Sequence, residues 1–421
     1  MSDDASAGAT LPPAGRSRSP RVDSSAVGTR SNAVRSRPFW LAQAENDTLL
    51  ADDDVAATAD VVVVGGGIMG VATAYWLAKR RVSVQLLEAA ELCFGATGRN
   101  IGLFLPGLNP IEAPENVETV CAEEGIAAGC KVVGHLALAT SPSVWDRIRI
   151  EAQNRGGRIE ALDRRDCEAL VRGPLADEIC GGRWYRDARV IDPVQLTCGL
   201  ARAARQHGAK ITMRQRVRRI ETKAGSHAVS TGKARILARH VVVACNAWSP
   251  LLIPELRTLI KARPAQVFAT DPASPALPFG LALDWGTVYW RQAPNGAVLA
   301  GGLGQLDRSS DPRRCQAVNH IVQHEVARTL DRVFPGRKLP KVRRRWAGLM
   351  DAIPDGRSIV DRLPETGVWV AAGLAGHGLP PGLGIGRAVA ASLCAGRIAT
   401  EIMPYGLARF AGRFAASPSD H

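Results

Sequence analysis

The chain has 421 residues, of which 46% are hydrophobic and 22% charged, and its formal net charge is +13. This composition is typical of a soluble globular protein of two or three domains, and it argues against a chain without a hydrophobic core. The positive charge is spread along the chain, mostly as arginine, without a lysine-rich run or a nucleic-acid motif, so we expect no nucleic-acid partner.

The N-terminal segment, residues 1–36, is rich in Ser, Ala, Arg, Asp, Pro and Gly and has no apolar period, which predicts a disordered tail. It contains no signal-peptide-like apolar core, and the nine cysteines form no CxxC pair, so we expect a reduced, cytoplasmic protein. Glycines interrupt the longest apolar run, Val61–Ala78, which therefore predicts a strand, a turn and a helix rather than a membrane span.

The first strong motif is this strand–turn–helix segment. Four consecutive valines, Val61–Val64, predict a parallel strand that is buried on both faces. A GxGxxG turn and a helical segment over 71–78 follow. The first glycine permits the tight turn, the second lets a pyrophosphate approach the backbone, and the third lets helix and strand pack closely. The residues expected at the turn, where free helix N–H groups favour an anion, are Gly65, Gly67, Ile68, Met69 and Gly70.

A second strand, over 82–87, ends in Glu88. A carboxylate at that place accepts a hydrogen bond from a ribose 2′-hydroxyl and repels a 2′-phosphate. Arg81 stands where such a helix usually ends in glycine, so either a left-handed arginine costs about 1 kcal/mol or the turn differs. The order of these elements predicts a doubly wound α/β domain that binds a dinucleotide.

A glycine-punctuated loop, Gly95-Ala96-Thr97-Gly98-Arg99-Asn100-Ile101-Gly102, follows and carries hydroxyl, guanidinium and amide donors suited to a long cofactor. We call it the GRN loop. With Asp192–Pro193, the strand Val241–Ser249, and the segments Trp346–Gly356 and Gly373–Gly378, it resembles the D-amino-acid oxidase-like family of FAD-dependent oxidoreductases. That family includes glycine oxidase, sarcosine oxidase and amine dehydrogenases, and the resemblance extends over residues 58–405.

The resemblance implies two domains. A Rossmann-like FAD-binding domain is expected from residues 58–106, 187–250 and 343–405. A substrate domain with a mainly antiparallel sheet is expected from 107–186 and 251–342, with 406–421 as a C-terminal tail. Alternation of apolar and polar residues on both sides of Pro294-Asn295-Gly296 predicts a hairpin of that sheet over 287–302.

The resemblance also implies cofactor contacts. Arg216–Val217 would lie by the adenine, the GRN loop by the pyrophosphate or flavin, and Gly376-His377-Gly378 beside the flavin ring, ahead of a helix over 384–395. The expected cofactor-binding residues are Gly65, Gly67, Ile68, Met69, Gly70, Glu88, Thr97, Gly98, Arg99, Asn100, Val217, Asn246, Trp248, Gly376, His377 and Gly378. Relatives with covalent flavin use a histidine at the place of Arg99-Asn100 or a cysteine near the C-terminus, whereas Cys394 lies inside the last helix, so we expect non-covalent FAD.

Two departures from the family concern the substrate. Residues 108–114 run almost straight into the next matching segment, so a helix that usually walls the substrate domain is missing. Where relatives often carry a carboxylate-binding arginine, this chain has Met350-Asp351, and Asp351 either accepts a cationic amine or caps a turn. The substrate-pocket candidates are Tyr289, Arg291, Met350, Asp351 and His377, and no catalytic base is identified.

These features predict FAD-dependent oxidation of an amine or amino acid by hydride transfer to flavin N5, with the imine product hydrolysed by water. The electron acceptor is expected to be oxygen or a quinone- or dye-type acceptor. A flavin-binding subunit with little catalysis of its own, an NAD-dependent dehydrogenase and a tRNA-modifying enzyme are the alternatives. No metal site is expected, because His320 and His324 have the spacing of a solvated helix face and lack a third ligand.

Overall fold

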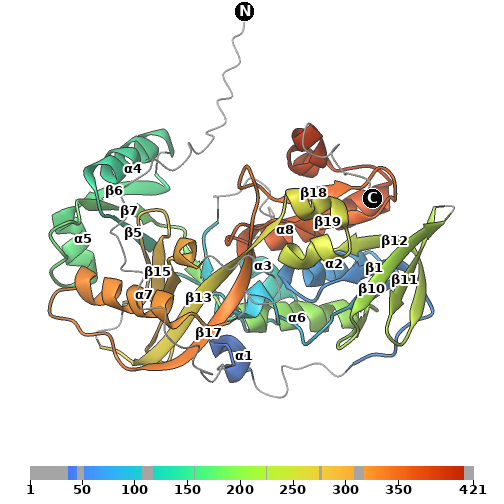
Figure 1. The fold of residues 1–421 in the computed structure, drawn as a ribbon, viewed down its shortest axis with the longest axis horizontal. Coiled ribbons are helices and arrows are strands. Elements are labelled where there is room, and N and C mark those ends of the chain that lie inside the picture. The colour runs from blue at the N-terminus through green and yellow to red at the C-terminus, as the bar shows by residue number, and fades with distance from the viewer. Residues whose placement is uncertain are drawn as a thin grey trace, which may run out of the picture. The chain divides into compact units, whose positions relative to one another are not determined.

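The computed structural model describes residues 37–44, 52–106, 117–155, 157–223, 225–274, 277–307 and 317–411. These residues form two large sheets and a small one (Figure 1). The expected disordered tail, residues 1–36, lies outside the described residues, and so does most of the shortened connection after the GRN loop, residues 107–116.

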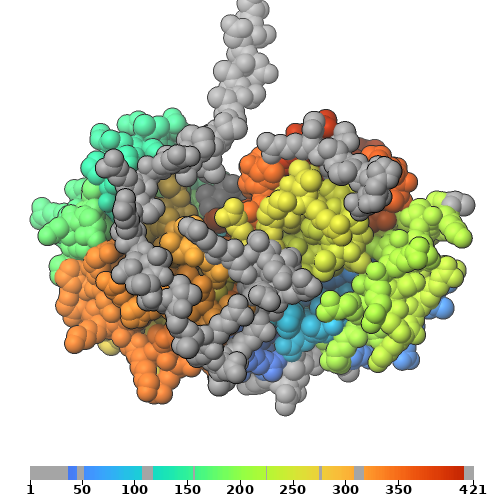
Figure 2. Space-filling model, in the orientation of Figure 1, coloured from blue at the N-terminus to red at the C-terminus, as the bar shows by residue number. Residues whose placement is uncertain are grey.

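The first sheet has the strand order β10-β11-β12-β1-β2-β9, with β19 beside β12 and β18 beside β19. Strand β1 pairs in parallel with β12 and β2, whereas β10, β11 and β12 form an antiparallel meander whose edge lies at the surface in Figure 2. The strands are β1 (Thr58–Val64), β2 (Val84–Leu87), β9 (Lys210–Thr212), β10 (Val217–Lys223), β11 (Ser226–Thr231), β12 (Arg235–Val243), β18 (Ile359–Arg362) and β19 (Trp369–Ala372).

Both faces of β1 are buried, as its four valines predict. Val61 and Val63 join a core cluster with helices α2 (Ile68–Ala78), α6 (Pro193–Gln206) and α8 (Leu379–Ala395). Val62 and Val64 join a second cluster on the other face. Helix α2 is buried along its whole length because it packs against both α6 and α8.

The second sheet has the order β17-β13-β16-β15-β14-β5-β7-β6, and within it only β14 and β5 pair in parallel. Its strands are β5 (His135–Ala139), β6 (Ile159–Asp163), β7 (Gly181–Tyr185), β13 (Lys261–Pro272), β14 (Gly280–Leu283), β15 (Val288–Gln292), β16 (Ala297–Gly302) and β17 (Val342–Ala352). Helices α4 (Pro142–Arg155), α5 (Arg164–Val171) and α7 (His320–Val333) lie on its side of Figure 1. The predicted hairpin is confirmed as β15 and β16.

The expected fold class, a Rossmann-like α/β sheet with a second, mainly antiparallel sheet, is confirmed. The division of the chain into two domains stays a prediction. Strand β17, which that division gave to the FAD-binding domain, is hydrogen-bonded to β13 of the second sheet. Leu407 and Phe410, placed in the C-terminal tail by the sequence, are buried in the second core cluster.

Smaller elements complete the described chain. A three-stranded sheet joins β3 (Leu103–Phe104), β8 (Arg189–Val190) and β4 (Lys131–Val132). The short helices are α1 (Phe39–Gln43), α3 (Val117–Glu123), and the 3-10 helices η3 (Ala96–Gly98), η4 (Asn246–Leu251), η5 (Pro254–Thr258), η6 (Gly304–Leu306), η7 (Thr400–Tyr405) and η8 (Leu407–Phe410). Helix α8 begins at Leu379, earlier than expected. Pro380 and Pro381 lie in its first turn, where the helix tolerates proline because the N–H groups of that turn have no acceptor within the helix.

The turn between α2 and β2 contains the left-handed arginine that the sequence offered as one alternative. Arg81 has φ 61°, and its N–H donates to Ala78 O at 2.8 Å. Its side chain is exposed. The backbone strain is therefore not compensated by burial of the arginine.

We expect Arg81→Gly to raise the free energy of unfolding by about 0.5–1 kcal/mol, because glycine adopts a positive φ without steric cost. Urea unfolding followed by circular dichroism measures the change. The matched control is Arg80→Gly, which removes a bond from the Arg80 guanidinium to Trp76 O without relieving a positive φ. Equal destabilisation by both substitutions would refute the strain at Arg81.

Candidate functional site

The glycine turn between β1 and α2 has the close backbone packing that its GxGxxG pattern predicts. Gly65 has φ 117°, and a Cβ on it would lie 2.5 Å from Ala244 O of the neighbouring chain segment. A Cβ on Gly70 would lie 2.0 Å from Gly65 O. Both positions therefore exclude a side chain, and the helix N-terminus reaches the end of β1.

The N-terminus of α2 is bordered by the GRN loop. Val71 is the first residue whose N–H bonds within the helix, to Gly67 O, so the preceding N–H groups have no acceptor within the helix. Thr97 Oγ1 accepts the N–H of Ile68 at 3.1 Å and lies 3.2 Å from the position of a Cβ on Gly67. Two motifs far apart in the sequence thus meet at one anion-binding helix end.

Glu88 lies beside the same turn. Its carboxylate accepts hydrogen bonds from Gly66 N at 2.7 Å and from Ala90 N at 2.8 Å. Burial raises the pKa of Glu88, and these bonds together with the charge of Arg216 partly oppose that shift. Residues 214–217 run alongside, since Gln215 N donates to Glu88 O at 2.8 Å. The expected ribose-binding acid and the segment expected by the adenine are therefore neighbours.

The GRN loop is held by its own side chains. Asn100 Nδ2 donates to Thr97 O at 2.7 Å, and Asn100 Oδ1 accepts Gly102 N at 2.7 Å. A Cβ on Gly98 would lie 2.4 Å from Cys93 O. These contacts close the loop into a fixed turn, so Asn100 shapes the backbone near the predicted pyrophosphate.

Arg99 ties this loop to the second sheet. Its Nε donates to Phe94 O at 2.7 Å and its Nη1 donates to Ala347 O of β17 at 2.8 Å. In return Trp346 Nε1 donates to Arg99 O at 2.9 Å. The guanidinium is buried in these contacts and lies 4.9 Å from the Phe94 ring centroid, so a direct bond from Arg99 to the cofactor stays a prediction.

A second set of hydrogen bonds joins the segments after β12 and β19 to β17. Asn246, with φ 47°, donates through Nδ2 to Asp351 Oδ1 at 2.8 Å and accepts Gly373 N through Oδ1 at 3.1 Å. Asp351 Oδ2 accepts Ala375 N at 2.9 Å. Since both carboxylate oxygens of Asp351 have partners, the geometry favours the turn-capping alternative over an amine acceptor. Trp248, in the same 3-10 helix as Asn246, packs its ring 3.2 Å from a Cβ position on Gly95 of the GRN loop.

The loop before α8 faces the end of β17. Gly376 has φ 81°, and a Cβ on it would lie 3.2 Å from Met350 Sδ. His377 is exposed, and its Nδ1 lies 3.1 Å from Ala375 O. Gly378 is the N-cap of α8, so the helix N-terminus follows this loop directly. The place of the flavin ring beside these residues stays a prediction.

Strand register puts three of the substrate-pocket candidates on one face of the second sheet. Tyr289 pairs with Gly301, Gly301 with Val267, and Val267 with Trp346, so Tyr289, Arg291 and Met350 share that face. Burial raises the pKa of Tyr289 to about 12.

Arg291 is less available than the sequence suggested. Burial lowers its pKa to about 10, its Nη1 donates to Gly102 O at 2.9 Å, and its guanidinium lies 5.2 Å from the Trp40 ring centroid. These contacts hold the guanidinium against the GRN loop and α1. The structure thus gives Arg291 a role in packing the loop, and its role in the substrate pocket stays a prediction.

Two residues of this face were missed by sequence reasoning. His135 on β5 and Arg183 on β7 are 3% and 9% exposed, and register places both on the face of Tyr289. His135 Nδ1 and Arg183 Nε have no hydrogen-bond partner among the described residues, although Arg183 Nη1 forms an ion pair with Glu151 Oε2 at 3.1 Å. Burial, with the charges of Arg183 and His377, lowers the pKa of His135 to about 3. The sequence signal that could have identified His135 and Arg183 is that each is a single polar residue in an otherwise apolar or aromatic strand.

Other expectations concern residues away from this region. His320 and His324 are exposed on α7, as expected, and the described part of the chain contains no group of three or more His, Cys, Asp or Glu residues able to hold a metal ion. The cysteines in the described ranges are free thiols. No helix among the described residues is long and apolar enough to span a bilayer.

The geometry fits a dinucleotide such as FAD. The glycine turn has no room for Cβ atoms, which lets a ligand approach the backbone closely. The helix end has N–H groups for the phosphate oxygens, and Glu88 lies beside the turn, where it can accept a ribose hydroxyl. The N-terminus of α8 carries partial positive charge, and its place beside the flavin ring stays a prediction.

Comparison with known proteins supports this. The sarcosine oxidase subunit beta of Rhizobium meliloti (strain 1021) is 27% identical over 347 residues, which cover 75% of this chain and 79% of that protein. The gamma-glutamylputrescine oxidoreductase of Escherichia coli (strain K12) is 25% identical over 389 residues, covering 84% and 85% of the two chains. The L-proline dehydrogenase structure from P. horikoshii superimposes with a TM-score of 0.73 at 24% identity, covering 85% of this chain and 99% of that one.

A family model described as FAD dependent oxidoreductase (DAO) matches residues 60–392, which include the glycine turn, the GRN loop, β17 and most of α8. The family resemblance seen in the sequence motifs is thereby confirmed, and FAD is the cofactor of this group of flavoproteins. The chain belongs to the DAO family of FAD-dependent oxidoreductases.

Proposed function

We propose that this protein oxidises the carbon–nitrogen bond of an amine or amino acid. The observation that carries the proposal is the assembly, in a DAO-family chain, of a dinucleotide cradle whose GRN loop contacts a sheet face with buried polar side chains. Bound FAD would supply the chemistry by accepting hydride at N5 from the C–H beside a neutral amine nitrogen, and water would hydrolyse the imine. The names of two relatives, sarcosine oxidase and gamma-glutamylputrescine oxidoreductase, support a substrate of this class.

The chain's own residues would bind and orient. The turn Gly65–Gly70 and Thr97 would hold the pyrophosphate, and Glu88 would accept the ribose hydroxyl. The N-terminus of α8, after Gly378, would stabilise negative charge on the reduced ring. The cofactor would be held without a covalent bond, because Arg99-Asn100 replaces the linking histidine and Cys394 is exposed at the far end of α8.

The substrate would lie against the face of the second sheet that carries Tyr289 and Met350. Since its pKa is about 3, His135 is neutral at pH 7 and offers a hydrogen bond without a charge. Arg183 is the neighbouring fixed cation on this face and has one N–H without a partner among the described residues. An amino acid carboxylate would therefore find this N–H on a guanidinium that also pairs with Glu151, whereas the deprotonated amine would need only the apolar and neutral groups.

An anaerobic screen tests the proposed reaction. Amines and amino acids are added to the purified, oxidised protein, and we expect at least one to bleach the flavin absorption band. The control is photoreduction, which bleaches the flavin without substrate. Full photoreduction with no bleaching by any amine or amino acid would favour the alternative of a flavin-binding subunit with little catalysis of its own.

We expect Glu88→Ala to weaken FAD binding by about 1–3 kcal/mol, the scale of a charged hydrogen bond left unmade. Fluorescence titration of the apoprotein with FAD measures the change. Glu91→Ala is the matched control, because Glu91 lies on the surface in an ion pair with Arg37 at 2.9 Å. Unchanged affinity in folded Glu88→Ala protein would assign the ribose contact to another group.

Reduced protein is expected to react slowly with oxygen and faster with a quinone or dye. No lysine occurs between Lys261 and Lys338, so the hairpin of β15 and β16 supplies no lysine ammonium to favour a developing superoxide anion. The hairpin's cation Arg291 is held by Gly102 O and Trp40 instead. Stopped-flow reoxidation in air-saturated buffer measures the rate, and a rate far above that of free reduced flavin would mark an oxidase.

A further inference from the structure

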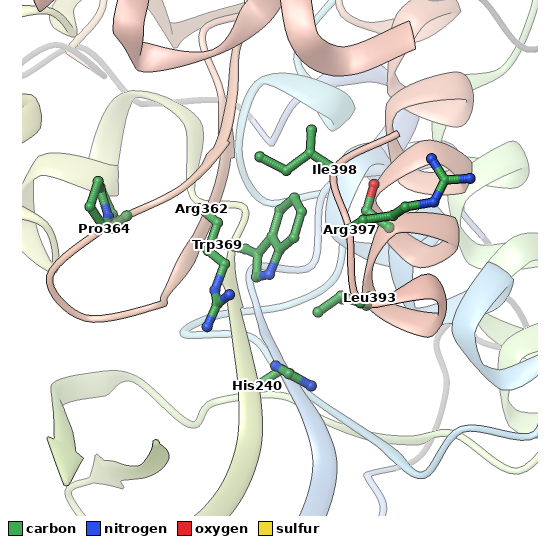
Figure 3. A pocket seen from close by; sticks show the side chains of 10 residues that line it. His240, Arg362, Pro364, Trp369, Leu393, Arg397 and Ile398 are labelled. Carbon is green, nitrogen blue, oxygen red and sulfur yellow. The ribbon is translucent and has the colours of Figure 1, made fainter. Parts of the chain in front are cut away.

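A cavity of about 350 Å³ lies between strands of the first sheet and the end of α8 (Figure 3). Its wall is formed by β12, by the end of β18 with the loop after it, by the beginning of β19, and by the last turn of α8 with the residues that follow. The lining residues are His240, Arg362, Leu363, Pro364, Trp369, Ser392, Leu393, Gly396, Arg397 and Ile398. No residue expected to bind the cofactor or the substrate is among them.

The cavity is well separated from the proposed FAD site. Helix α8 runs for 17 residues from Leu379, beside the predicted flavin ring, to Ala395 at the cavity, which is about 25 Å at 1.5 Å per residue. On β12, His240 pairs with Val61 in the middle of β1, whereas Gly65 follows the C-terminal end of β1. A ligand in this cavity would therefore bind at a site distinct from the substrate.

One side of the cavity has hydrogen-bond donors without acceptors. Trp369 Nε1 has no hydrogen-bond acceptor among the described residues, and Figure 3 shows the indole nitrogen on the side of the ring nearer His240 and Arg362. Arg362 forms no ion pair within the described ranges, and its Nε makes one long contact, 3.4 Å, with Gly367 O. Figure 3 shows the Arg362 guanidinium directed toward the His240 side of the cavity.

The charges around this side are mainly positive. Burial lowers the pKa of His240, and the nearby charges of Arg362 and Arg239 lower it further while Asp60 opposes them. His227 lies in the same field, since burial, His240 and Arg362 lower its pKa. No lining residue is acidic.

The nearby negative groups do not neutralise Arg362. Asp361 directs its carboxylate to backbone N–H groups, accepting Leu407 N at 2.7 Å and Arg362 N at 2.7 Å. Asp60 lies 3.7 Å from Arg239. The carboxyl end of α8 adds a partial negative charge. Arg397, which follows the C-cap Gly396, offsets this charge.

The opposite side of the cavity is apolar. Leu363 is 4% exposed, and Leu393 in the last turn of α8 and Ile398 just after the helix are partly buried. The hydroxyl of Ser392 is occupied, since it donates to Ala388 O and accepts Ala399 N. A ligand that fits would carry its charge at one end and an apolar body at the other.

We propose that this cavity binds a small organic anion, with a carboxylate or phosphate group on Arg362 and Trp369 Nε1–H and an apolar body against Leu393 and Ile398. A volume of about 350 Å³ is at the lower end of small-molecule sites, which suits a single ring or a short chain. A charged hydrogen bond from the guanidinium would hold the anion, and the indole N–H would orient it. The site does not depend on the identity of the oxidised substrate.

Calorimetric titration of the FAD-loaded protein tests the site with phenyl phosphate and phenylacetate as probes. We expect at least one to bind, and the better of the two identifies a phosphate or a carboxylate ligand. Arg362→Gln should weaken that binding by about tenfold or more, and Trp369→Phe, which keeps a ring but removes the N–H, by a smaller factor. The flavin absorption spectrum and the FAD content should be the same in all variants.

Arg328→Gln is the charge-matched control, because Arg328 lies exposed on α7 in a surface ion pair with Glu325 at 3.4 Å. It should leave probe binding unchanged. The proposal is overturned if neither probe binds at millimolar concentration, or if Arg362→Gln and Arg328→Gln weaken binding equally. Binding of inorganic phosphate as tight as that of phenyl phosphate would also overturn it, since the apolar wall would then contribute nothing.

Discussion

Strand β17 belongs to the second sheet, yet buried and partly buried hydrogen bonds join it to both loops that border the proposed cofactor site. At one point Arg99 and Trp346 exchange bonds between the GRN loop and β17. Further along, Asp351 accepts bonds from Asn246 and from Ala375 N. Breaking such a bond leaves a buried polar group unsatisfied at a cost of about 1–3 kcal/mol, so β17 fixes the position of the loops relative to the sheet.

This constraint explains why so many residues near the site have a backbone conformation that is costly elsewhere. Asn246 and Ala375 have positive φ without being glycine, and Gly373 and Gly376 flank Ala375 in the same region. The carboxylate of Asp351 stabilises this conformation by accepting a hydrogen bond from the N–H of Ala375. Strain of this kind persists only where the surroundings determine it from several directions, which is common at functional sites.

Helix α8 is the element shared by the two sites. Its N-terminus follows Gly378 beside the predicted flavin ring, and its C-terminus forms one wall of the cavity with Trp369 and Arg362. Its middle is buried against α2, where a Cβ on Gly386 would lie 2.7 Å from the backbone N of Thr73. Because this close packing fixes the middle of α8, its two ends have defined positions relative to the first sheet.

The sequence by itself determined the parts whose chemistry is local. Glycine spacing, β-branched runs and a following acid specify the β1–α2–β2 unit, because a tight turn and a helix N-terminus depend on residues close in the chain. At Arg81 the missing glycine left two alternatives, of which the structure has the left-handed arginine. Only the tertiary structure decided the partners of Arg99, Arg291 and Asp351, and it alone brought His135 and Arg183 to the face of Tyr289. Those contacts join strands far apart in the chain, and the register that creates them depends on the whole sheet.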